Sequence, residues 1–194
     1  MHTVHAFAFH AYQRIIDWWL AYVLEYVTAW ITTTYVCESE VDRQTGLALL
    51  PYFSQRGCLI RPAVDSQLYS AAKIAPARLA QRRLRAEPIR LGTISSFSPQ
   101  ENLWHLLFVV RRLVVEHALS VELEIIGDGM QAGNLFAWVV SNGLQNVIKF
   151  RGWSNDAVAV MRQRDLFVLS SLWEGLPCTV VEARLLHLPV VAYG

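Results

Sequence analysis

Hydrophobic positions in the second half of the chain follow two alternating patterns. Short apolar, often β-branched runs are separated by longer segments whose apolar residues recur three or four positions apart. The first pattern predicts strands and the second predicts helices. The predicted strands are PIRLGTI, VELEIIG, NVIKFRG, DLFVLS and PVVAYG, and the predicted helices are ENLWHLLFVVRRLVVEHAL, a segment around NLFAWVVSNGL, DAVAVMRQR and PCTVVEARLLH. This alternation predicts an α/β fold with a parallel sheet that helices cover on both faces.

The first half of the chain is less regular. It predicts strands in TVHAFAF and TTTYVCE, a helix over residues 10–29, and a second helix in SEVDRQTGLALL with Ser39 as its N-cap. The segment GCLIRPAVD ends in a turn. A basic stretch with five Lys or Arg side chains follows and marks a change in composition.

We therefore expect three parts: a partial N-terminal domain over residues 1–70, a basic linker over residues 71–88, and a C-terminal domain over residues 89–194. The charge of the linker is explained either by a solvated helix or by contact with an anionic lipid or phosphate.

The 194-residue chain is apolar, with 54% hydrophobic and 17% charged residues, whereas soluble domains average about 25% charged. Three explanations are open: a membrane protein, a soluble protein whose parallel strands are buried on both faces, or a fragment that lacks its covering partner. Residues 15–36 are long enough to span a bilayer. Asp17 and Glu25 interrupt them, and ITTTYV is β-branched, so a helix followed by a buried strand is favoured.

Charge and cysteine usage exclude some functions. The net charge of +1 gives no indication of nucleic-acid binding. The three cysteines have no metal-ligand spacing and are typical of packing residues in a reducing cytosol. The start MHTVHAF lacks the basic region of a signal peptide. With no Asp-x-Asp motif and no clustered His or Cys, we expect no specific metal site.

Two glutamates stand eight positions apart in SLWEGLPCTVVEA. Pro177 suits the first turn of a helix, which would place Glu174 and Gly175 in the loop between strand and helix, and Glu182 inside the helix. Ligands of open α/β sheets bind at the carboxyl ends of the strands. This spacing therefore predicts a ligand site at Glu174, although it also fits two solvent-exposed glutamates.

The ligand would carry phosphates and hydroxyls. The amides of Gly175 and Leu176 and the positive end of the helix dipole would face the site and favour anions. A carboxylate accepts hydrogen bonds from two neighbouring hydroxyls. A sugar nucleotide has both kinds of group.

The segment SSLWEGLPCTVVEARLLHLPVVA resembles the signature of glycosyltransferase family 4, whose members are retaining enzymes of the GT-B fold. Further blocks resemble the family in the same order along nearly the whole chain: TVHAFAF, TTYVCESEVDR, LIRPAVDSQLY, LGTISSFSPQENL, VELEIIGDGM and NVIKFRGW. The resemblance implies a Rossmann-like donor domain preceded by part of an acceptor domain.

The resemblance also implies roles for individual residues. Glu174 would contact the transferred sugar, and Glu182 would contact the ribose hydroxyls. The Gly175-Leu176-Pro177 segment would meet the sugar and the diphosphate, and Gly152 and Trp153 would border the base.

His5 matches the family histidine that reaches the donor sugar. A lone histidine is more often structural, so this role depends on the family motif alone.

Two positions depart from the family. An Arg and a Lys usually hold the diphosphate in the loop after the first donor-domain strand, where this chain has Ser96 and Glu101. A carboxylate ~4 Å from a phosphate charge is repelled by about 4 kcal/mol at an effective dielectric of 20. Ser96 can still donate a hydrogen bond, and Arg61 or Arg151 could compensate. We expect Glu101 to oppose a bound diphosphate.

By this resemblance we expect the chain to start late in the family's acceptor domain and to stop before its last donor-domain elements. We therefore interpret it as a truncated or decayed member, or as one fragment of a split gene. On this interpretation the helix over residues 10–29 and the sheet edges expose apolar surface.

The leading hypothesis is a retaining transferase that needs no cofactor or metal. It would move a sugar from a nucleotide sugar, expected to be a UDP-sugar, to a polysaccharide or glycolipid acceptor in the cytoplasm of a bacterium. Peripheral contact with the inner face of the membrane is part of this hypothesis. The alternatives are a non-catalytic remnant, which Ser96 and Glu101 favour, and a nucleotide-sugar epimerase, which the two-glutamate motif fits less well.

Overall fold

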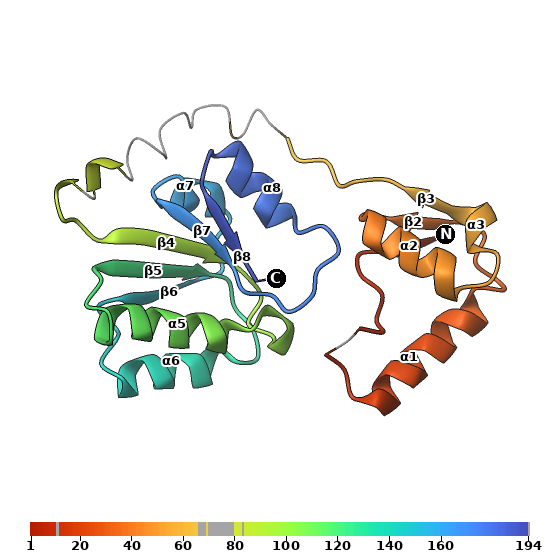
Figure 1. The fold of residues 1–194 in the computed structure, drawn as a ribbon, viewed down its shortest axis with the longest axis horizontal. Coiled ribbons are helices and arrows are strands. Elements are labelled where there is room, and N and C mark those ends of the chain that lie inside the picture. The colour runs from red at the N-terminus through yellow and green to blue at the C-terminus, as the bar shows by residue number, and fades with distance from the viewer. Residues whose placement is uncertain (11, 66–68, 70–79, 83, 194) are drawn as a thin grey trace. The chain divides into compact units, whose positions relative to one another are not determined.

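The computed structural model describes residues 1–10, 12–65, 69, 80–82 and 84–193, which divide into two units. The N-terminal unit comprises Met1–Ala63 and Trp173–Pro177, and the C-terminal unit comprises Val64–Leu172 and Cys178–Gly194 (Figure 1). Most of the predicted linker lies outside the described residues, so the expected three-part division stays a prediction.

The N-terminal unit contains a three-stranded parallel sheet of order β1-β2-β3. Its elements are β1 (His2–Val4), α1 (Ile15–Thr28), β2 (Tyr35–Cys37), α2 (Glu40–Leu49), α3 (Phe53–Arg56) and β3 (Gly57–Leu59). The predicted N-cap is confirmed, since the Ser39 side chain accepts a hydrogen bond from the backbone N–H of Asp42. Both predicted strands are shorter than expected. After β1, Phe7 and Phe9 are buried and stack on each other.

Helix α1 buries none of its residues completely. Its exposed apolar face comprises Ile15, Ile16, Trp19, Leu20, Val23, Leu24 and Val27. The expectation that this helix exposes apolar surface is confirmed. Among the described residues, no helix combines the length and the apolarity that crossing a bilayer requires.

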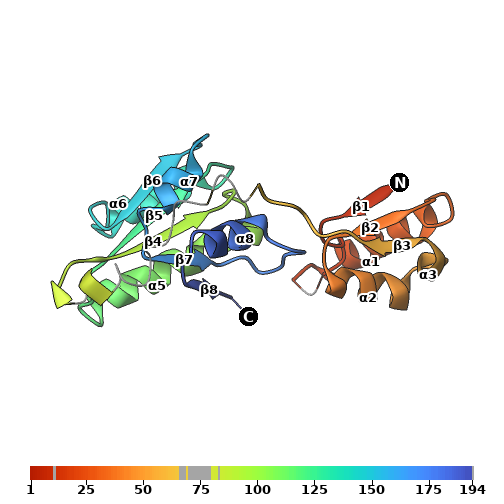
Figure 2. The same cartoon turned by 90° about the horizontal axis from the view of Figure 1, so that it is seen from above.

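The C-terminal unit contains a five-stranded sheet of order β6-β5-β4-β7-β8 in which every pair is parallel (Figures 1 and 2). Its elements are β4 (Ile89–Ile94), the 3-10 helix η2 (Pro99–Glu101), α5 (Leu103–Val115), β5 (Val121–Ile126), α6 (Ala132–Ser141), β6 (Ile148–Gly152), α7 (Ala157–Met161), β7 (Leu166–Leu169), α8 (Cys178–Leu185) and β8 (Val190–Ala192). The predicted order of strands and helices is confirmed, as is the α/β class.

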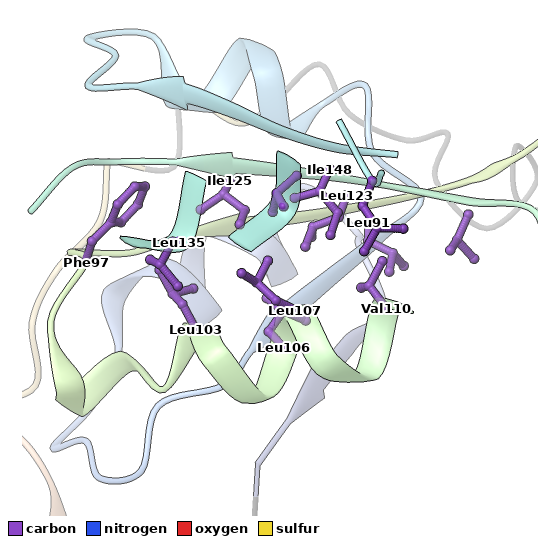
Figure 3. Packing of buried hydrophobic residues seen from close by; sticks show 13 residues of the cluster. Leu91, Phe97, Leu103, Leu106, Leu107, Val110, Leu123, Ile125, Leu135 and Ile148 are labelled. Carbon is purple, nitrogen blue, oxygen red and sulfur yellow. The ribbon is translucent and has the colours of Figure 1, made fainter. Parts of the chain in front are cut away.

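Helices cover the two faces of this sheet. Leu103, Leu107 and Val110 of α5 and Leu135 of α6 pack with Ile125 and its neighbours on β4–β6 (Figure 3). A second cluster joins α7 and α8 to the other face and includes Met161, Phe167, Ala183 and Leu186. The expected burial of the strands on both faces holds for the central strands. It is wrong for β6 and β8, whose edge positions leave several side chains exposed.

Two buried carboxylates are paired within the C-terminal unit. Glu124 on β5 lies 3.0 Å from the Arg164 guanidinium and also pairs with Arg151. Asp165, fully buried before β7, pairs with Arg82 at 3.0 Å and accepts the backbone N–H of Arg90 at 2.9 Å. These partners are required because an unpaired buried carboxylate is costly.

Candidate functional site

The carboxyl ends of the parallel strands in the C-terminal unit meet at one edge of the sheet. The turn after β5 is packed directly on the loop after β4. Gly127 and Gly129 have φ angles of +135° and +157°, and a Cβ atom on them would lie 1.9 Å from Ser95 O and 2.7 Å from Phe97 N. Only glycine fits these two positions, so this part of the edge consists of backbone.

Glu101 links the loop after β4 to the end of β7. Its carboxylate accepts hydrogen bonds from Ser171 Oγ at 2.8 Å and from Ser96 Oγ at 3.2 Å. Its backbone carbonyl accepts one from Ser170 Oγ at 2.7 Å. Ser170 and Ser171 are both buried. Ser96 and Glu101, which by resemblance stand where the family has cations, thus contact each other.

The sequence alone did not indicate a role for Ser170 and Ser171, which donate hydrogen bonds to Glu101. The pair Ser170-Ser171 ends three positions before Glu174, the first glutamate of the motif. Its contact with a residue about 70 positions earlier could not be found without the fold.

Glu182 lies on α8, as predicted, and lines a narrow cavity with Tyr69, Ile94 and Phe167. A hydrogen bond joins Tyr69 to Glu182. Burial, and then the charge of Glu182, raise the pKa of the Tyr69 phenol to about 12. Sequence reasoning missed Tyr69, although the block LIRPAVDSQLY contains it.

Gly152 and Trp153 lie at the carboxyl end of β6. The Trp153 side chain is 82% exposed, and its indole N–H donates to Asn155 Oδ1 at 3.3 Å. An exposed aromatic face at this edge is available for stacking. Arg151, considered as a compensating cation, pairs with Glu124. Arg61 belongs to the N-terminal unit and is exposed.

The segment Trp173–Pro177 groups with the N-terminal unit. The backbone of Gly175 approaches that of His5 so closely that a Cβ atom on Gly175 would lie 1.7 Å from His5 O. Leu176 is half-buried and Glu174 is exposed. Pro177 directly precedes α8, so the prediction that it lies within the first turn is wrong by one residue.

The structure thus brings His5 and Gly175 together, and it groups Glu182, Gly152, Trp153, Ser96 and Glu101 in the C-terminal unit. The His5 ring is exposed, and its Nδ1 lies 2.8 Å from Glu38 Oε1. The roles of all these residues towards a ligand stay predictions. In the described part of the chain, no three His, Cys, Asp or Glu side chains are grouped so that they could hold a metal ion.

The C-terminal unit, an open parallel sheet with helices on both faces, has the architecture of a Rossmann-like α/β domain. The family description "Glycosyl transferases group 1" matches residues 88–194, and the chain belongs to this family.

Curated relatives carry related descriptions. The chain is 26% identical over 200 residues to the UDP-Gal:alpha-D-GlcNAc-diphosphoundecaprenol alpha-1,3-galactosyltransferase of Escherichia coli, covering 98% of this chain and 50% of the relative. It is 28% identical over 138 residues to the putative glycosyltransferase EpsF of Bacillus subtilis, covering 71% of this chain and 36% of the relative. The chain thus spans half or less of the length of these relatives.

Solved glycosyltransferase structures of the GT-B type share the fold. Anabaena HepE, crystallised with UDP and glucose, matches with a TM-score of 0.70 at 22% identity, covering 89% of this chain and 48% of HepE. Staphylococcus aureus TarM, in complex with Fondaparinux, alpha-GlcNAc-glycerol and UDP, matches with a TM-score of 0.77 at 20% identity, covering 98% of this chain and 36% of TarM.

Proposed function

We propose that this chain acts in a retaining glycosyltransferase of family 4 that transfers a sugar from a UDP-sugar to a lipid-linked or polysaccharide acceptor. The observation that carries the proposal is the match to the E. coli galactosyltransferase, which extends over 98% of the chain. That relative's name specifies a UDP-galactose donor and a diphosphoundecaprenol-linked acceptor. The chemistry of the carboxyl edge of the C-terminal unit supports the same donor class.

Each part of a UDP-sugar has a candidate partner. Glu182 accepts hydrogen bonds from the ribose hydroxyls, and Trp153 borders the uracil. The backbone amides after Glu174 bind the diphosphate and stabilise the charge that develops on it as it leaves. Glu174 and His5 contact the transferred sugar. The acceptor hydroxyl attacks on the face that the diphosphate leaves, which retains the anomeric configuration. We assign no metal or cofactor to this reaction.

The test is a transfer assay with radiolabelled UDP-galactose, UDP-glucose and UDP-GlcNAc and a synthetic GlcNAc-diphospholipid acceptor. We expect a lipid-linked product with an α-linkage by NMR, formed equally well in EDTA and lost in Glu182→Ala. The matched control is Glu116→Ala, which removes an exposed glutamate on the far end of α5. Binding of UDP without transfer would favour a non-catalytic remnant, which the Ser96 and Glu101 replacements support. Epimerised donor would reveal an epimerase.

We also propose peripheral contact with the inner face of the cytoplasmic membrane. The exposed apolar face of α1 supports this contact because it carries aliphatic residues together with Trp19, and tryptophan is enriched at membrane interfaces. In a sedimentation assay, the wild-type chain should pellet with phospholipid vesicles. The Leu20→Asp variant should stay in the supernatant, and its presence in the pellet would contradict the contact.

A further inference from the structure

We propose that Glu38 is a positioning residue that holds His5 in the tautomer with its proton on Nδ1. The exposed Nε2 of His5 then accepts a hydrogen bond from a hydroxyl of the transferred sugar. This inference rests on the proposed function and adds to it Glu38, which lies in the block TTYVCESEVDR but has no role assigned by resemblance.

The geometry of the pair defines the direction of the hydrogen bond. His5 Nδ1 lies 2.8 Å from Glu38 Oε1. An ionised carboxylate can only accept, so the imidazole must donate from Nδ1. In a neutral imidazole the other nitrogen is then an acceptor. The side chain of His5 is 76% exposed and that of Glu38 only 14%, so the carboxylate is the fixed partner.

The backbone around Glu38 is held on both sides. Cys37, the last residue of β2, is fully buried, and its carbonyl accepts the backbone N–H of Ile60 at 2.9 Å. Ser39 caps α2 through the backbone N–H of Asp42. Glu38 therefore cannot shift without disturbing either the strand or the helix cap.

His5 also lies beside the segment that carries the proposed sugar contact. Its carbonyl oxygen is the atom that a Cβ on Gly175 would overlap, and Gly175 directly follows Glu174. A sugar bound at this segment would be within reach of an exposed side chain on the same unit. Without Glu38, a neutral imidazole in water prefers its proton on Nε2, which would turn the sugar-facing nitrogen from an acceptor into a donor.

The tautomer can be measured without any ligand. Long-range ¹H–¹⁵N NMR on the full chain, at a pH where histidine is neutral, distinguishes the two tautomers, and the His5→Asn variant assigns the signal. We expect Nδ1–H in the wild type and in Glu38→Gln, whose amide oxygen still accepts, and Nε2–H in Glu38→Ala. The control is Glu40→Ala, which removes a nearby carboxylate that binds Arg43 and Gln44 instead. Nε2–H in the wild type would overturn the proposal.

Calorimetry then tests the sugar contact. Glu38→Ala should weaken UDP-galactose binding roughly 3- to 10-fold, the size of one net hydrogen bond, and should leave UDP binding unchanged. Glu38→Gln should restore most of the loss. Equal loss for UDP and UDP-galactose would show a merely structural role and overturn the inference. If the wild type binds neither ligand, the proposed function fails together with the sugar contact, whereas the NMR result still decides the tautomer.

Discussion

The hydroxyl of Ser171 donates a hydrogen bond to the carboxylate of Glu101 over 2.8 Å, joining the end of β7 to the helical turn after β4. By resemblance to the family, Glu101 stands where a lysine is usual. The carboxylate is therefore held in place by neutral donors at the edge where we propose that the diphosphate binds.

Replacing Glu101 with lysine should strengthen the binding of UDP. The change removes a repulsion and adds an attraction worth about 1–3 kcal/mol, which corresponds to a roughly 5- to 150-fold higher affinity. Titration calorimetry at low and high salt checks this, since the gain should shrink as salt screens the charges. Glu101→Gln, which keeps an acceptor for Ser171, should give a smaller gain. Unchanged affinity at low salt would show that this loop does not face the phosphates.

Ser171→Ala should destabilise the C-terminal unit. The substitution removes a buried donor and leaves the Glu101 carboxylate with fewer partners, so the free energy of unfolding should fall by about 1–3 kcal/mol. Urea denaturation measures the change. Ser141→Ala is the control, because that exposed hydroxyl bonds to groups close to it in sequence, donating to Trp138 O and accepting from Asn142 Nδ2. A double-mutant cycle with Glu101→Ala should recover a coupling energy, and purely additive effects would contradict the contact.

Asp165→Ala should be far more damaging than a surface substitution. It leaves the backbone N–H of Arg90 without its acceptor and removes the buried partner of Arg82, which keeps its ion pair with Glu87. Removing one partner of a buried pair costs up to about 3–5 kcal/mol. Chemical denaturation should show this loss. Glu116→Ala, which removes an exposed partner of Arg112, should change stability by less than about 0.5 kcal/mol. Similar losses in the two variants would contradict the burial of Asp165.

The phenol of Tyr69 should ionise at a higher pH than that of an ordinary tyrosine. Its pKa is raised to about 12, whereas an unfolded tyrosine has a pKa of about 10. The folded state therefore holds this proton more tightly, and the resulting stability is complete below pH 10 and is lost as the pH rises through about 12. Absorbance at 295 nm should show a tyrosine ionisation step near pH 12. The Tyr69→Phe variant should lack this step, and in Glu182→Gln it should occur at lower pH. Persistence of the step in Tyr69→Phe would refute the assignment.

The C-terminal unit was predictable because its strands and helices differ clearly in hydrophobic period, and each run of β4, β5 and β7 is bounded by polar or turn residues. Local signals also sufficed for the Ser39 cap, which needs only a neighbour three positions away. The length of β1 was not predictable. Phe7 and Phe9 alternate with alanines as in a strand, yet their side chains are buried in a loop.

The contacts within the candidate site could not be predicted for a different reason. Tyr69 meets Glu182 and Glu101 meets Ser171 only because the fold brings together segments that are far apart in the sequence. The pair of His5 and Glu38 depends in the same way on β1 lying beside β2. No local sequence pattern indicates such pairs. The two-glutamate motif, in contrast, can be recognised in the sequence because its two members are only eight positions apart.

The strand order of the C-terminal sheet has a consequence for how the chain folds during synthesis. All buried members of the larger core cluster lie between Leu91 and Ile148. Strands β4, β5 and β6, with α5 and α6, therefore leave the ribosome as a nearly complete hydrophobic core. Strands β7 and β8 then add to the free side of β4. Folding can begin before the segment with the two-glutamate motif has left the ribosome, and the carboxyl edge of the sheet is completed last.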